Sequence, residues 1–124
     1  MKQEFSDALR ADPERYELAK NAAFLLDGIA ATTSARVTAE WKICPRWSEG
    51  PLYDHPPHRI FLEVVLRDDE GTVTTGHLGG HERDDRRELK YRMARIWGDF
   101  LEQRSLLFYA RLVEPTPELG VTQA

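Results

Sequence analysis

Apolar residues recur along this chain at two different periods, which predict helices on either side of a group of strands. After Asp12, apolar residues stand three or four positions apart as far as Ile29, the spacing of a helix with one buried face. Asp12, Pro13 and Glu14 suit the start of that helix as cap, first-turn proline and favourable charge. Its apolar stripe comprises Leu18, Ala19, Ala22, Leu25, Leu26 and Ile29. Phe24 lies away from this stripe, and residues 5–9 suggest a short helical piece before it.

Between residues 35 and 78 the pattern changes to alternation, which predicts three strands. Residues 35–44 carry an apolar side chain at every second position until Pro45 ends the run. Residues 59–67 form the second strand and residues 72–78 the third, joined by a turn at 68–71 in which Gly71 can adopt a positive φ. Strands with one apolar and one polar face are typical of antiparallel sheets.

A second helix is predicted over residues 82–104. Its apolar stripe comprises Leu89, Met93, Ile96, Trp97 and Phe100. Residues 106–113 are open to two interpretations, a continuation of the helix or a fourth strand. The alternation of Leu106, Phe108, Ala110 and Leu112 favours the strand. Residues 114–124 contain two prolines and are expected to form a flexible C-terminal tail.

These elements predict an α+β domain of order α-β-β-β-α, with a further strand if residues 106–113 form one. Both amphipathic helices are expected to pack on the single apolar face of a small antiparallel sheet. The chain of 124 residues has the length of one domain, which we place at residues 1–113.

Composition narrows the class of protein further. Hydrophobic residues make up 41% and charged residues 31%, a balance that allows a folded core without disulfides or metals. Cys44 is the only cysteine, which excludes an intramolecular disulfide and favours a reducing compartment. The N-terminus does not resemble a signal peptide and no apolar run reaches membrane-spanning length, so we expect a cytoplasmic protein. The net charge of −4 counts against a nucleic-acid binder.

No known catalytic pattern is present in the sequence. Two histidine pairs, His55 with His58 and His77 with His81, have spacings at which zinc is bound, and Cys44 or Asp54 could add a ligand. Both pairs fall in predicted loops, where solvated histidines are common, so we predict neither a metal nor a cofactor. Cys44 beside a loop histidine could serve as a nucleophile, but a small residue at a strand end explains it equally well. Enzymatic activity is therefore not the favoured interpretation.

The segment between Pro45 and Pro57 offers the clearest candidate for binding. It is long for a loop in a compact domain, and its four prolines reduce the entropy lost on binding. Arg46, Trp47 and Tyr53 are of the residue types that anchor protein interfaces. The alternative is that Trp47 and Tyr53 fold back over a sheet edge or the core.

Two short motifs resemble the double-stranded-RNA-binding domain. Pro56-Pro57-His58 precedes the second strand, and Arg86-Arg87-Glu88-Leu89-Lys90 lies near the start of the last helix. Together with the order helix–strand–strand–strand–helix, the similarity covers about residues 13–103. The resemblance implies that His58 enters a minor groove of duplex RNA and that Arg86, Arg87 and Lys90 contact phosphates. The long loop after the first strand and the acidic net charge depart from that family's pattern.

The favoured hypothesis is a non-catalytic domain that recognises a protein partner, as an adaptor, an inhibitor or a subunit of a complex. Arg46, Trp47, Tyr53 and Phe24 are its predicted contacts. Binding of duplex RNA is the alternative, and a small metal-dependent enzyme is the third hypothesis. A homodimer is also compatible with the sequence, since a sheet edge or Phe24 could pair with a second copy.

Overall fold

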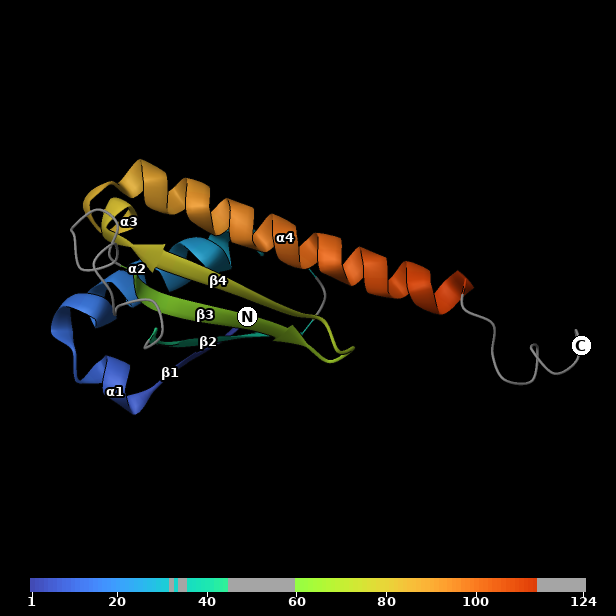
Figure 1. The fold of residues 1–124 in the computed structure, drawn as a ribbon, viewed down its shortest axis with the longest axis horizontal. Coiled ribbons are helices and arrows are strands. Elements are labelled where there is room, and N and C mark those ends of the chain that lie inside the picture. Colours follow the sequence, from blue (N-terminus) through green and yellow to red (C-terminus); the bar gives the residue numbers. More distant parts are fainter. Residues whose placement is uncertain (32, 34–35, 45–59, 114–124) are drawn as a thin grey trace, which may run out of the picture.

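A computed structural model of the chain describes residues 1–31, 33, 36–44 and 60–113. Figure 1 shows a sheet with two long helices, and the predicted α+β class is confirmed. The elements in chain order are β1 (Lys2–Phe5), α1 (Asp7–Arg10), α2 (Pro13–Ile29), β2 (Val37–Ile43), β3 (Ile60–Asp68), β4 (Val73–Gly79), α3 (Gly80–Asp84) and α4 (Arg86–Val113). Three strands lie between two long helices in the chain, as the hydrophobic pattern predicted. The predicted tail, residues 114–124, lies outside the described residues.

The sheet has the strand order β1-β2-β3-β4 and is mixed. Strands β2, β3 and β4 are antiparallel, as expected, whereas β1 is an unforeseen strand that pairs parallel to β2. Phe5 ends this strand beside Trp41, so the expectation that residue 5 belongs to a helix was wrong. The Gln3 side chain accepts a hydrogen bond from the Trp41 indole N–H. Four residues with a single large apolar side chain give no periodic signal, which is why β1 escaped prediction.

The core lies between one face of the sheet and the helices α2 and α4. Val37, Ala39 and Trp41 of β2 are buried there, which confirms the predicted face of this strand. The predicted helix stripes are also confirmed. Their buried members are Leu18, Ala19, Ala22, Leu26, Leu89, Met93, Ile96, Trp97 and Phe100. Helix α4 packs tightly on the sheet at Gly76 of β4, where an added Cβ would lie 2.5 Å from Cδ1 of Ile96.

Helix α4 differs from its prediction at both ends. It begins only at Arg86, because Asp85 has an extended backbone (φ −138°) and its carboxylate accepts the Arg87 N–H at 2.9 Å. Residues 82–84 belong to the separate helix α3. At the other end the helix continues to Val113, so the favoured strand over residues 106–113 was wrong. Leucine, alanine and arginine are good helix formers, and no glycine or proline interrupts this stretch.

The β3–β4 turn is fastened to α4. Gly71 has φ +94°, the only positive φ among the described residues, and closes the turn. Oδ1 of Asp68 accepts the N–H groups of Glu70 and Thr72, both at 2.9 Å. Nε of Arg104 lies 3.6 Å from Oδ2 of Asp68, and Arg111 donates a hydrogen bond to the Glu70 carbonyl. The last turns of α4 extend beyond this hairpin, away from the sheet (Figure 1).

Candidate functional site

Three charged or titratable side chains form a row across the sheet face opposite the helices. Register places Lys42 on β2 opposite Glu63 on β3, and Glu63 opposite His77 on β4. Glu63 bridges the row, since its Oε2 lies 3.2 Å from Nζ of Lys42 and its Oε1 lies 3.1 Å from Nε2 of His77. Alternation explains the arrangement, because the residues that flank these positions point into the core.

Cys44 completes a cluster with two members of this row. Its thiol, a Glu63 carboxylate oxygen and a His77 ring nitrogen all lie within 4.8 Å of one another. Cys44 is buried, with 1% of its surface exposed, whereas Glu63 and His77 are partly exposed. Two of the residues that the sequence offered as metal ligands, Cys44 and His77, are therefore brought together. The prediction that His77 lies in a loop was wrong, since it belongs to β4 and pairs with Glu63. The third member, Glu63, was not among the candidates.

Neighbouring side chains keep Glu63 ionised and hold the backbone at His77. Burial raises the pKa of the Glu63 carboxyl, but hydrogen bonds from Lys42 and His77 outweigh this effect and leave the pKa below its usual value. Glu63 is thus a carboxylate at neutral pH. The backbone carbonyl of His77 accepts a hydrogen bond from Nε of Arg92 on α4 at 3.1 Å. This contact ties the end of β4 to the long helix.

The other residues considered for metal binding do not extend the cluster. His55, His58 and Asp54 lie outside the described residues, as does the side chain of His81. Glu63 could have been found by aligning the strands, since a histidine in one strand and a glutamate in the next both fall on the polar face. The sequence did not provide the register needed for that alignment.

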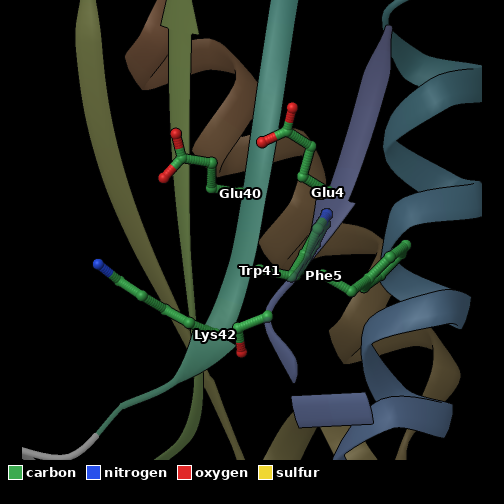
Figure 2. A pocket seen from close by; sticks show the side chains of 6 residues that line it. Glu4, Phe5, Glu40, Trp41 and Lys42 are labelled. Carbon is green, nitrogen blue, oxygen red and sulfur yellow. The ribbon is translucent and has the colours of Figure 1, made fainter. Parts of the chain in front are cut away.

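A small hollow opens where β1 meets β2, and Figure 2 shows the side chains that line it. The rings of Phe5 and Trp41 are stacked beside it, with centroids 6.5 Å apart. Glu4, Glu40 and Lys42 provide its polar lining. Its volume of about 180 Å³ is below the roughly 300–1,000 Å³ of small-molecule sites, so it is not a strong candidate for ligand binding.

The outer side of α4 carries seven of the ten exposed large apolar side chains among the described residues. Its exposed large apolar side chains are Tyr91, Leu101, Leu106, Phe108, Tyr109, Leu112 and Val113. A groove of about 460 Å³ runs beside the helix, lined by Leu101, Arg104, Ser105, Phe108 and Glu70 of the hairpin turn. Isolated exposed apolar residues are ordinary, but this concentration of them on one helix makes it a candidate protein interface.

Of the four predicted protein contacts, Phe24 alone lies among the described residues. Phe24 projects from α2 with 73% of its surface exposed, as its position off the helix stripe indicated. Arg46, Trp47 and Tyr53 lie outside the described residues. Their role in binding therefore stays a prediction.

The predicted RNA contacts lie at the start of α4. Arg86, Arg87 and Lys90 are exposed there, and His58 lies outside the described residues. Acidic residues stand among these cations, since a depression beside Arg87 is lined by Asp85 and Glu88 as well as by Tyr91. Acidic side chains among the cations weaken the attraction of this surface for the phosphates of RNA.

Comparisons with protein-family models, with curated proteins and with solved structures gave no match for this chain. The helices of the described residues include none with an apolar stretch sufficient to cross a bilayer. A function for this chain is therefore inferred from the surfaces described above.

Proposed function

We propose that this chain is a protein-binding domain that works through the outer side of α4, and that its partner there is a second copy of the chain. The observation that carries the proposal is a seam of exposed, uncharged residues along the helix. Its members are Tyr91, Ala94, Gly98, Leu101, Ser105, Phe108 and Leu112.

The seam has the spacing of a helix–helix contact. Successive members stand alternately three and four residues apart, the repeat that keeps one side of a helix against a neighbour. Every member is exposed, so the contact is not made within the described part of the chain. At 1.5 Å per residue the seam is about 32 Å long. A second helix can therefore lie along it.

Antiparallel pairing of two copies makes six of the seven members of this seam complementary to one another. Reversing α4 about its midpoint places Tyr91 opposite the partner's Phe108, Ala94 opposite the partner's Ser105, and Gly98 opposite the partner's Leu101, while Leu112 falls opposite the partner's Arg87. At the middle of the contact each Leu101 packs against a glycine, which lets the two helices approach closely. An added Cβ at Gly98 would meet no atom within 4 Å, so this part of the helix is open to a neighbour.

Charge supports the same arrangement. Arg95 and Glu102 are exposed on one flank of the seam, and the reversal brings each beside the opposite charge of the other copy. The large apolar side chains of the seam itself are 38–67% exposed. At 150–250 Å² for each fully exposed aromatic they leave on the order of 400 Å² uncovered. A standard interface buries about 800 Å² on each partner, so residues beside the seam must supply the rest of the contact.

Sedimentation equilibrium of the full chain over a range of concentrations tests the proposal. We expect a dimer, and we expect Phe108→Glu to convert it to a monomer because a carboxylate would be buried in the seam. The matched control is Leu106→Glu, since Leu106 is equally exposed but lies about 110° around the helix from the seam. Wild-type protein that stays monomeric at every concentration, or equal dissociation of both variants, would contradict the proposal.

Duplex RNA is the alternative ligand, favoured by the exposure of Arg86, Arg87 and Lys90 on one end of α4. A gel-shift titration at two salt concentrations separates the two functions. RNA binding would be strongest at low salt, because phosphate contacts release counterions. Absence of a shift at low salt removes this alternative and leaves the sedimentation result unaffected.

A further inference from the structure

We propose that Cys44, Glu63 and His77 bind one divalent cation of the zinc type on the sheet face opposite the helices. The proposal is independent of the helix seam, which lies on α4. It depends on the identity of three donor groups, on their separation and on the elements that carry them.

The donor set selects the class of metal. A thiolate, an imidazole and a carboxylate are the three side-chain ligands that zinc uses in proteins. Calcium and magnesium require oxygen ligands throughout, so a cysteine and a histidine disfavour them. Zinc and its spectroscopic substitute cobalt are the ions that this set suits best.

The separation of the donors is close to what a tetrahedral ion requires. With bonds of about 2.0–2.3 Å, neighbouring ligand atoms lie about 3.5 Å apart. The three donor atoms lie within 4.8 Å of one another, and the Glu63–His77 pair is already at 3.1 Å. The widest separation, at most 4.8 Å, exceeds the tetrahedral spacing by about 1 Å, so the donors need a shift of that size to share one ion. The three donors found among the described residues leave one position of a tetrahedral ion for a further ligand.

The elements that carry the donors are rigid. Glu63 and His77 are paired residues of neighbouring antiparallel strands, and Cys44 follows the last residue of β2. Nε of Arg92 holds the backbone at His77. Sites built on strands keep their geometry better than sites on loops, because the ladder fixes each Cα.

The neighbouring Lys42 orients the carboxylate of Glu63 in this site. Nζ of Lys42 holds Oε2 of Glu63 at 3.2 Å, which leaves Oε1 facing His77. Metal binding replaces the Glu63–His77 hydrogen bond with two bonds to the ion, and the proton that Nε2 of His77 donated to the carboxylate passes by way of solvent to Nδ1, while the lysine continues to orient the carboxylate. Cys44 loses its proton to solvent when the thiolate binds.

Competition with a chromophoric zinc chelator tests the site in the full chain after metal removal. We expect one zinc per chain, and at least a tenfold loss of affinity in each of Cys44→Ser, Glu63→Gln and His77→Gln. Cobalt should give a thiolate charge-transfer band that Cys44→Ser abolishes. The control is Glu40→Gln, a carboxylate of the same sheet face that pairs with Arg67 and should leave affinity unchanged.

Folding of each variant is checked by circular dichroism, and the partly exposed His77 provides a second test if replacement of the buried Cys44 disturbs the fold. Failure of the wild-type chain to compete for zinc would overturn the proposal. Zinc affinity that is equal in the wild type and in the folded His77→Gln variant would also overturn it, because binding would then occur elsewhere.

Discussion

Gly76 is the residue on which the contact between α4 and β4 depends. Its missing side chain leaves room for Ile96, a core residue with 2% of its surface exposed. A Cβ at this position would lie 2.5 Å from Cδ1 and 2.7 Å from Cγ1 of Ile96, well inside van der Waals contact. Either the helix must move away from the sheet or Ile96 must leave its preferred rotamer.

We therefore expect Gly76→Ala to lower the free energy of unfolding by about 1–3 kcal/mol, the usual cost of overpacking a core. Urea denaturation at a fixed protein concentration measures the change. Gly28→Ala is the control, since no atom lies within 4 Å of the added Cβ and alanine favours the helix by up to about 1 kcal/mol. Similar losses in the two variants would show that the close contact is not the cause.

At the scale of elements, the β3–β4 hairpin and α4 hold one another in place through Asp68. This side chain is only 2% exposed, yet it accepts two backbone N–H groups and lies beside Arg104. Burial raises the pKa of Asp68, but these hydrogen bonds and the neighbouring guanidinium outweigh it and lower the pKa below its usual value. The charged form is therefore the one that stabilises the hairpin.

The pH dependence of stability follows from the sign of that shift. Because the folded pKa is lowered, stabilisation by Asp68 is complete above the unfolded pKa near 4 and is lost as pH falls through the folded value. We expect Asp68→Asn to destabilise the domain by about 1–3 kcal/mol at pH 7. The difference from wild type should shrink as pH falls below about 4. Thermal unfolding across this range, with Asp69→Asn as control, checks the prediction; a difference that is constant with pH contradicts it.

The two long helices and strands β2 and β3 could be predicted because each repeats its apolar pattern over seven or more residues. Strand β4 was indicated by its β-branched residues after a turn. β1 could not be predicted, since its four residues form a strand only through pairing with β2, which lies more than thirty residues later in the chain. The end of α4 was misassigned because Leu106, Phe108 and Leu112 fit a period of two as well as a helix. Local sequence does not decide between these periods in so short a stretch.

The candidate sites show the same limit. Phe24 was predicted to lie away from the apolar stripe because the period of one helix is enough to place it, and its side chain is exposed. The association of Cys44 with Glu63 and His77 depends on the register of three strands, which the sequence leaves open. The seam on α4 has a regular spacing in the sequence, but only a helix that continues to Val113 gives it its full length.

For the whole molecule, the proposed antiparallel dimer predicts a specific electrostatic pairing. Reversal of α4 about its midpoint sets Arg95 beside the partner's Glu102 on both sides of the symmetry axis. Arg95→Glu should therefore weaken the dimer, because it places like charges together, and so should Glu102→Arg alone.

The double variant Arg95→Glu with Glu102→Arg restores the opposite charges and should recover most of the lost affinity. Dimer dissociation constants from sedimentation equilibrium at low ionic strength measure this, since screening reduces such pairs at high salt. Recovery in the double variant would support the antiparallel register. If the two single effects simply added in the double variant, the helices could not be paired in this way.

The short strand β1 also covers one edge of the sheet. It occupies the hydrogen-bonding edge of β2, a strand rich in the residue types that form intermolecular sheets. Lys2 and Glu4 of β1 form an ion pair at 3.1 Å, and charged side chains on a short outer strand discourage the addition of further strands. We therefore expect that proteolytic loss of these few residues would leave the edge of β2 unpaired and able to add strands from other molecules.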